Sequence, residues 1–289
     1  MRVNNGTITI LTKIVVDLSK ANQKLTALLI TYNEMEHIKQ SVASVSFADE
    51  IIVVDSFSTD GTFEYLKSLS NVIVLQKEFS NFTDQKAYTL SKASNNWVLF
   101  IDADEVVSKP LQNEILTTIN SLNTSSAYWF YRKFMFKNHS LNFSGWQTDK
   151  NIRLFKKSHC SFTKGRLVHE TLQVKGETSA LNEKLTHYCY KSYKDYKRKM
   201  VQYGSLKASE LFLKNKSFNI LKLVFKPIWK FVYNYFFRLG ILDGYKGFII
   251  CYLNALSVYI RYSKLYRLKN EIHLASTTEQ EKEYHLKTA

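Results

Sequence analysis

The sequence contains few of the residues that break or cross-link a chain. Two prolines and nine glycines in 289 residues are too few for long disordered linkers. The three cysteines, Cys160, Cys189 and Cys251, are odd in number and widely spaced. This pattern argues against a disulfide framework and against a zinc site, and it favours reduced, unpaired thiols in a cytosolic protein.

Long hydrophobic runs are also missing. The longest uncharged run, Gly247–Ile260, has 14 residues, which is short of the ~20 that a membrane-spanning helix needs. Residues 1–24 hold only short apolar patches and no signal-peptide core, so we expect a frayed N-terminal extension there. The hydrophobic fraction of 45% is nevertheless ordinary for a globular protein, and the length allows one large domain or two small ones.

Acidic residues are scarce in one part of the chain. Between Lys191 and Asn270 there are 17 Lys or Arg but only three Asp or Glu, a net charge of +14 out of +15 for the whole sequence. The rest of the chain is therefore almost neutral. This shift predicts a boundary near residue 190, between an electrically balanced part and a basic part.

The balanced part alternates apolar runs with segments of helical periodicity. Four apolar runs predict strands: 25–31, 50–55, 72–75 and 97–101. The run at 25–31 predicts a buried strand, and the run at 97–101 predicts a strand that is buried on both faces. Segments between them predict helices: 35–45, 63–69 and 83–93. Asn33 is the expected N-cap of the first helix, and Ser108 with Pro110 is expected to open another. The alternation predicts parallel strands joined by right-handed crossovers.

Polar side chains follow three of these strands. Thr31 to Glu34 follow the first strand, Asp55 ends the second, and Asp102 and Asp104 follow the fourth. The carboxyl ends of parallel strands share one edge of a sheet, which is where open α/β folds bind ligands. Carboxylates are suited to Mg²⁺ or Mn²⁺ held together with a phosphorylated substrate. The sequence thus predicts a cation and diphosphate site, although acids at strand ends also cap helices.

Three motifs, in this order, resemble glycosyltransferase family 2. They are Thr31-Tyr-Asn-Glu34, Val53-Val-Asp-Ser-Phe-Ser-Thr-Asp-Gly-Thr62 and Phe100-Ile-Asp-Ala-Asp-Glu105, and the resemblance extends over roughly residues 25–190. Within the family, the chain resembles bacterial glucosyltransferases of the lipopolysaccharide inner core. The cues for this narrower resemblance are Phe82-Thr-Asp-Gln-Lys86, Gly145-Trp146, Asp149, Arg153-Leu-Phe155, Val168-His-Glu170 and His187.

The resemblance implies an α/β fold of the GT-A (Rossmann-like) type. This fold has a mixed, mainly parallel sheet flanked by helices, and here a basic helical extension follows it. The implied activity is that of an inverting hexosyltransferase, which moves glucose or another hexose from a UDP-sugar to a lipid-linked saccharide such as lipopolysaccharide core. The implied cofactor is a divalent metal, Mg²⁺ or Mn²⁺. We expect a catalytic domain over 25–190, with a nucleotide-binding half at 25–105 and an acceptor-binding half at 106–190, and a membrane-associating region at 191–289.

The resemblance also implies which residues contact the donor. The nucleotide-binding residues are Thr31, Tyr32, Asn33, Glu34, Asp55, Lys86 and Asp102. Among them, Asp55 accepts a hydrogen bond from the base and Asp102 reaches the ribose. The implied metal ligands are Asp104 and Asp102, with His187 as a further one. Asp55 can instead serve as a capping acid, and Lys86 as a solvated helix lysine.

An inverting transfer also needs a general base that takes the proton of the acceptor hydroxyl. The resemblance points to Glu170, with Asp149 as the second candidate and Glu105 as the third. Asp149 can alternatively hold acceptor hydroxyls. Contacts with the acceptor or the diphosphate are expected from Trp146, Arg153 and His169. Core packing is the alternative role of the tryptophan.

The basic part contains an aromatic-rich stretch, Phe218–Arg238, in which Lys222, Lys226 and Lys230 recur every four residues. This spacing predicts an amphipathic helix with the lysines on one face. Basic, aromatic and non-spanning helices are typical of the membrane interface. We expect a cytoplasmic enzyme that is peripheral on the inner face of the bacterial cytoplasmic membrane. The alternative is a helical pair packed on the catalytic domain with a solvated basic rim.

Two other functions remain open at this level. The basic block permits nucleic-acid binding, but the sequence contains no helix-turn-helix, ribonucleoprotein or zinc motif, so we expect no nucleic-acid partner. A sugar nucleotidyltransferase with the same fold is the other alternative. Against it, no glycine-rich phosphate loop opens the first strand. The sequence does not determine the oligomeric state.

Overall fold

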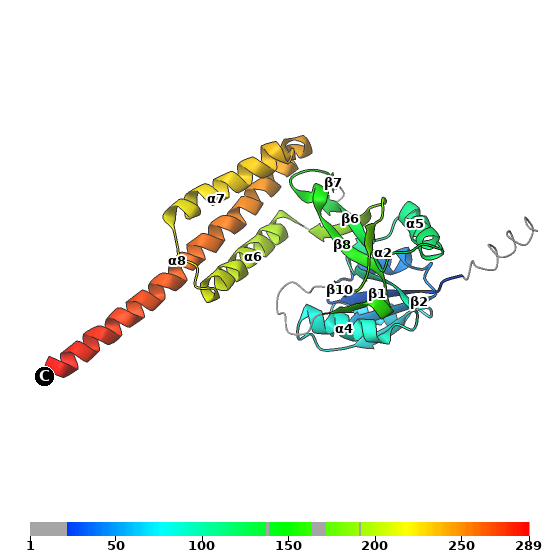
Figure 1. Cartoon of the computed structure of the whole chain (residues 1–289), viewed down its shortest axis with the longest axis horizontal. Coiled ribbons are helices and arrows are strands. Elements are labelled where there is room, and N and C mark those ends of the chain that lie inside the picture. Colours follow the sequence, from blue (N-terminus) through cyan, green and yellow to red (C-terminus); the bar gives the residue numbers. More distant parts are fainter. Residues whose placement is uncertain (1–21, 137–138, 163–171, 191, 289) are drawn as a thin grey trace, which may run out of the picture. The chain divides into compact units, whose positions relative to one another are not determined.

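The structure is a computed structural model that describes residues 22–136, 139–162, 172–190 and 192–288 (Figure 1). Side chains are described in these ranges except at residues 147, 189, 190 and 272–288. The chain forms two compact units. The sheet unit takes the described residues of 1–133 and 149–188, and the helical unit takes those of 134–148 and 189–289.

The sheet unit is built on a mixed sheet with a parallel centre. Its strands are β1 (Leu25–Thr31), β2 (Glu50–Asp55), β3 (Ile73–Gln76), β4 (Trp97–Asp102), β5 (Glu105–Val106), β6 (Ala127–Phe136), β8 (Lys150–Lys156), β11 (Thr178–Ala180) and β12 (Leu185–Tyr190). The order is β3-β2-β1-β4-β8-β6-β12-β5, and the first four strands are parallel. A separate antiparallel pair is formed by β9 (Cys160–Phe162) and β10 (Leu172–Val174). The predicted α/β class is confirmed.

Helices connect the parallel strands, as the alternation predicted. They are α2 (Ile38–Ser44), α3 (Thr62–Lys67) and α4 (Phe82–Lys92). Two further elements lie outside these crossovers: α5 (Lys109–Ile119), between β5 and β6, and the 3-10 turn η2 (Lys157–His159), between β8 and β9. The predicted cap of α5 is confirmed, because Ser108 Oγ accepts a hydrogen bond from the backbone N–H of Leu111. The first helix lies within the predicted range, but the prediction that Asn33 is its N-cap was wrong. Asn33 has a φ of 53° and lies before the helix, whose N-cap is His37.

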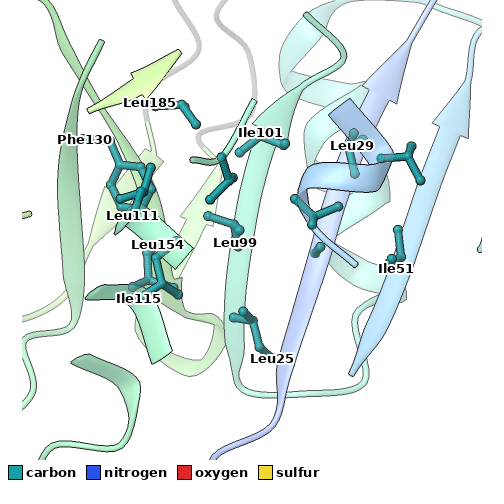
Figure 2. Packing of buried hydrophobic residues seen from close by; sticks show 14 of the residues in the cluster. Leu25, Leu29, Ile51, Leu99, Ile101, Leu111, Ile115, Phe130, Leu154 and Leu185 are labelled. Carbon is teal, nitrogen blue, oxygen red and sulfur yellow. The ribbon is translucent and has the colours of Figure 1, made fainter. Parts of the chain in front are cut away.

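The sheet has a hydrophobic core on each face. On one face, residues of β1, β2 and β4 such as Leu29, Ile51 and Leu99 belong to the same buried cluster as Leu111 and Ile115 of α5 (Figure 2). On the other face, alternate residues of the same strands pack against α4; this set comprises Leu28, Ile52, Val98, Phe100 and Leu90. Each fully buried apolar side chain contributes about 1.5–3 kcal/mol. The prediction of a strand that is buried on both faces at 97–101 is therefore confirmed.

The helical unit is dominated by three helices. Its elements are β7 (His139–Leu141), the 3-10 turn η1 (Trp146–Thr148), α6 (Tyr193–Leu213), α7 (Ile220–Val232), the π-helical turn η3 (Tyr233–Phe237), the 3-10 turn η4 (Gly240–Asp243) and α8 (Gly244–Thr288). Gly204 lets α6 approach α8 closely, because a Cβ atom there would lie 2.5 Å from the carbonyl oxygen of Ser257. Within the described residues, none of the helices is long and apolar enough to span a bilayer.

Residues 134–148 belong to this helical unit, whereas the sequence analysis grouped them with the acceptor-binding half. The reason is packing. Phe134, Phe136 and Leu141 share a buried cluster with Tyr196 and Ile250 of the helices. The pattern of apolar residues along a strand indicates that one face is buried, but it does not indicate which element covers that face.

Two cysteines have described side chains, and both are free thiols. Cys160 is half-buried and Cys251 is buried. Burial raises the pKa of Cys160 to about 12 and also raises that of Cys251. A thiol with a raised pKa is a poor nucleophile at neutral pH, so neither side chain is a candidate for covalent catalysis.

Candidate active site

The carboxyl ends of β1, β2 and β4 lie at one edge of the sheet. In the parallel register, Thr31 of β1 is opposite Asp55 of β2, and Ile30 is opposite Asp102 of β4. Adjacent strands are ~5 Å apart, so the three polar segments that follow these strands begin side by side at this edge. The structure thus brings together the strand ends from which the sequence analysis built its site.

Asp55 is fully buried at this edge. Its carboxylate accepts hydrogen bonds from Ser58 Oγ at 2.5 Å, from the Ser58 backbone N–H at 3.0 Å and from Gln76 Nε2 at 3.2 Å. These contacts order the turn after β2. Because a carboxylate offers about four lone-pair sites, these contacts use three of them.

The loops that follow β1 and β2 are hydrogen-bonded to each other. The Asn33 backbone N–H donates to Ser58 Oγ at 2.9 Å, and Asn33 Oδ1 accepts from the Thr59 backbone N–H at 2.8 Å. The Glu34 backbone N–H donates to Thr62 Oγ1 at 3.1 Å. The left-handed conformation of Asn33 aims its side chain across to the second loop. Because the Asn33 side chain accepts a hydrogen bond from the second loop, it does not cap α2.

Two exposed aromatic side chains border these linked loops. Tyr32 is 60% exposed and Phe57 is 49% exposed. Phe57 also has a φ of 59°, a left-handed conformation that is costly for a bulky residue. Sequence reasoning selected Tyr32 but missed Phe57, since no sequence signal reports a positive φ at a phenylalanine.

The Asp102 carboxylate is paired with two basic side chains. Arg153 Nη2 contacts its carboxylate directly, and Lys86 Nζ lies 3.7 Å from Oδ1. Burial by itself would raise the pKa of Asp102, but the charges of Arg153 and Lys86 outweigh burial and hold the pKa well below its usual range. Burial lowers the pKa of Arg153, yet Asp102 and Glu105 together raise it above its usual value. Both groups therefore stay charged.

Glu105 is the buried centre of this network, with no exposed surface. Its Oε1 lies 2.6 Å from Arg153 Nη2 and 3.6 Å from Arg132 Nη1. Its Oε2 accepts a hydrogen bond from the Asp102 backbone N–H at 3.0 Å. The carboxylate is thus committed to two guanidinium groups and to the turn before it. This commitment favours a positioning role over the role of general base.

Asp104 is paired with a histidine from a distant strand. His187 Nε2 lies 3.2 Å from Asp104 Oδ2. The pairing follows from the sheet, in which β12 is antiparallel to β5 with His187 opposite Glu105, and the Tyr188 backbone N–H donates to the Asp104 carbonyl at 2.9 Å. The sequence analysis named both side chains, and the structure brings them into contact.

Arg132 is a site residue that the sequence analysis missed. Its Nε and Nη2 atoms lie 2.6 and 2.5 Å from Asp149 Oδ2, and its Nη1 atom lies 3.4 Å from His187 Nδ1. A continuous series of polar contacts therefore runs from Asp149 to Asp104. No local motif identifies Arg132, because its neighbours on the aromatic strand β6 give no sign of a site.

The residues present suit a cation that is bound together with a nucleotide. Among the described residues, no three His, Cys, Asp or Glu side chains are close enough to form a metal site by themselves. Asp104 and His187 form a pair of ligand groups, whereas the charge of Asp102 is already compensated by Arg153 and Lys86. Mg²⁺ commonly uses one or two protein carboxylates and completes its shell with phosphate oxygens and water. Asp104 supplies one such carboxylate, with His187 beside it.

One predicted site residue that the structure describes, Trp146, is not brought into this network. Trp146 belongs to the helical unit, where its ring packs against Phe134 with 4.2 Å between centroids. This contact favours its alternative role in packing. His169 and Glu170 lie outside the described residues.

Comparison with solved structures returns S. aureus TarS at low sequence identity. Residues 1–349 of S. aureus TarS in complex with UDP are 17% identical, with a TM-score of 0.47 over 86% of this chain and 92% of that chain. The complex of the same protein with UDP-GlcNAc is 15% identical, with a TM-score of 0.45 over the same shares.

Curated relatives cover most of the chain. An uncharacterized glycosyltransferase of Rickettsia typhi is 31% identical over 257 residues, which cover 85% of this chain and 88% of that protein. The lipopolysaccharide core biosynthesis glycosyltransferase LpsC of Rhizobium meliloti is 26% identical over 250 residues, which cover 84% and 92%.

A family model described as "Glycosyl transferase family 2" matches residues 26–172. This range contains the three motifs at the ends of β1, β2 and β4, together with Asp104, Glu105 and Arg132, whereas His187 lies beyond it. The match favours glycosyl transfer over the alternative of a sugar nucleotidyltransferase. On the family match and the Rickettsia relative together, the chain belongs to glycosyltransferase family 2 and is a glycosyltransferase.

Proposed function

We propose that this glycosyltransferase moves a hexose from a UDP-sugar to a lipid-linked saccharide, with inversion at the anomeric carbon and with Mg²⁺ or Mn²⁺. The observation that carries the proposal is the convergence at one sheet edge of the loops after β1 and β2, the cation-compensated Asp102 and the Asp104–His187 pair. This arrangement offers separate places for a base, a ribose and a diphosphate.

The nucleoside end of the donor is assigned to the two linked loops. Tyr32 and Phe57 are exposed and directly precede Asn33 and Ser58, which are hydrogen-bonded to each other. Aromatic rings stack well on a planar base. The Asp55 carboxylate, as an acceptor, suits the N–H of a uracil. Lys86 Nζ, beside Asp102, suits the ribose–phosphate end.

The diphosphate end is assigned to Asp104 and His187, which would hold the cation. A divalent cation there stabilises the negative charge that develops on the leaving diphosphate, an effect worth several kcal/mol. Glu105 keeps the turn around Asp102 and Asp104 in place. Arg153 and Arg132 supply fixed positive charge beside these carboxylates, which limits the repulsion of an incoming diphosphate.

Glu170 is the proposed general base. The acceptor hydroxyl oxygen forms a bond to the sugar C1, the bond from C1 to the diphosphate oxygen breaks, and the hydroxyl proton passes to the Glu170 carboxylate. Attack opposite the leaving group inverts C1. Asp149 is less suited because its carboxylate is already paired with Arg132.

The acceptor is proposed to be a saccharide of the lipopolysaccharide core type. Support comes from the similarity to LpsC, whose name describes lipopolysaccharide core biosynthesis. We assign acceptor recognition to residues 106–190, with Arg153 and His169 as candidate contacts, and membrane association to residues 191–289. The enzyme would then work on the cytosolic side, peripheral to the inner membrane.

A thermal-shift panel tests the donor and the metal together. UDP-, GDP-, CMP- and dTDP-sugars are added with and without Mn²⁺. A UDP-sugar with Mn²⁺ is expected to raise Tm most, by roughly 5–10 °C at a concentration 100 times Kd. Tyr32→Ala should reduce this shift, whereas Tyr203→Ala, which removes another exposed tyrosine, should keep it. A larger shift with another nucleotide would reassign the donor.

The base assignment has its own test. Glu170→Gln is expected to lower kcat by about 10²- to 10⁴-fold, the usual contribution of a general base, while the donor-induced shift in Tm stays. The exposed Glu177→Gln is the matched control and should keep kcat. Unchanged turnover in Glu170→Gln would move the base to another residue.

A further inference from the structure

Helix α7 has two different apolar faces. Leu223, Pro227 and Phe231 are half-buried at four-residue spacing, and the Phe231 ring packs on Phe248 of α8 with 5.5 Å between centroids. This is the inner face of the helix. No residue of α7 is fully buried, so the inner face does not account for all its large apolar side chains.

The outer face of α7 is exposed and apolar. Leu221, Phe225, Ile228 and Trp229 are 54–63% exposed. With Lys222, Lys226 and Val232 they line a shallow groove of about 470 Å³. We call Leu221, Phe225, Ile228 and Trp229 the α7 apolar face. Soluble monomers rarely expose contiguous apolar patches of this kind without a binding role.

Aromatic rings extend this face beyond the end of the helix. Trp229 lies 6.1 Å from Tyr233 and 6.0 Å from Phe237, and Tyr233 lies 6.1 Å from Phe237, measured between ring centroids. Phe237 is 66% exposed. Clusters of tryptophan, tyrosine and phenylalanine that are wet on one side are typical of the lipid headgroup region.

The charge around this face is positive. The segment Ile220–Tyr252 contains five basic residues and one acid, Asp243. The Asp243 carboxylate accepts hydrogen bonds from the backbone N–H groups of Asn142 and Phe143 and from Ser144 Oγ, at 3.1 Å each. It is therefore used within the helical unit. Lys222, Lys226 and Lys230 form a row at four-residue spacing along one side of the α7 apolar face.

These observations select one occupant. A second copy packed antiparallel through this face would place the two lysine rows on the same side, which like charges disfavour. A bilayer with anionic headgroups matches both parts of the surface, because the rings enter the acyl boundary while the lysine ammonium groups reach the phosphates. We propose that the α7 apolar face docks on an anionic lipid surface. This deepens the proposed function, on which it rests for the lipid-linked nature of the acceptor.

Vesicle flotation of the full-length protein tests the proposal. Vesicles of phosphatidylcholine with 30% phosphatidylglycerol are compared with pure phosphatidylcholine. We expect the anionic vesicles to bind the protein and added NaCl to weaken binding. Phe225→Asp is expected to weaken binding at least tenfold, whereas Leu122→Asp, at a 77%-exposed leucine of the sheet unit, should leave binding unchanged.

A charge-matched pair separates a local from a global electrostatic effect. Lys222→Glu/Lys226→Glu and Lys67→Glu/Lys184→Glu change the net charge equally, and the second pair lies in the sheet unit. Only the first pair is expected to abolish flotation. Equal losses in both pairs would overturn the proposal, as would Phe225→Asp floating like the wild type.

Two further measurements distinguish lipid docking from dimer formation and from loss of the active site. Sedimentation velocity without vesicles tests whether the protein forms a dimer. A dimer that dissociates in the Phe225→Asp variant would overturn the proposal, because the α7 apolar face would then bind a second copy of the chain. The nucleotide-induced Tm shift reports on the active site independently and should persist in Phe225→Asp. Flotation without any nucleotide-induced shift would support the docking surface while contradicting the proposed function.

Discussion

Replacing Asp104 by asparagine is expected to lower kcat by about 10²- to 10³-fold, since charge stabilisation by a bound cation is worth several kcal/mol and each 1.36 kcal/mol is a factor of ten. The amide keeps the size of the side chain and its contact with His187. It removes the charge that would hold the cation. Turnover of a UDP-sugar, measured over a range of Mn²⁺ concentrations, provides the readout.

The Mn²⁺ dependence of activity distinguishes loss of a metal ligand from other effects of Asp104→Asn. The Mn²⁺ concentration that gives half-maximal activity should rise, while nucleotide binding in the absence of metal should change little. Asp195→Asn is the matched control, because it removes a carboxylate from the first turn of α6. If Asp104→Asn turned over at the wild-type rate with the wild-type Mn²⁺ dependence, the metal assignment would fail.

Replacing Glu105 by glutamine should produce the largest loss of stability. Removing one partner from a buried charge network costs about 3–5 kcal/mol, because the remaining charges stay buried without compensation. Here Arg153 and Arg132 both lose a carboxylate, and the Asp102 backbone loses part of an acceptor. Urea denaturation gives the difference in the free energy of unfolding.

Glu183→Gln is the control for Glu105→Gln, since Glu183 is exposed and in the same unit. We expect it to change stability by less than about 0.5 kcal/mol. Glu105→Gln should also weaken nucleotide binding at temperatures where the variant is folded, because Asp102 is then held less firmly. A loss below about 1 kcal/mol would show that Glu105 does not organise the network.

Much of the fold follows directly from the order of residues. The apolar runs at 25–31, 50–55 and 97–101 are strands in the structure, and each is covered on both faces. Strands that are buried on both faces need apolar side chains at most positions, so these strands appear in the sequence as nearly continuous apolar runs. The cap of α5 was also predictable, because Ser108 and Pro110 act within one turn.

The errors and omissions have a common cause. Asn33 has the chemistry of an N-cap, but its left-handed backbone lets it bridge to Thr59 instead. Phe57 is exposed at a positive φ, and Arg132 carries no local motif. These properties depend on contacts between segments 17 or more residues apart or on backbone strain, and neither leaves a local pattern.

The sequence alone determined that the chain has an α/β half with three polar strand ends, a basic half without a spanning helix, and the motifs of glycosyltransferase family 2. Parallel pairing made the meeting of Thr31, Asp55 and Asp102 predictable, because strands in register end together. Only the tertiary structure decided how the carboxylates are used: Asp102 and Glu105 are compensated by arginines, whereas Asp104 faces His187. The reason is that β8, β6 and β12 arrive from later in the chain, and their register, which no local pattern encodes, sets which charge meets which.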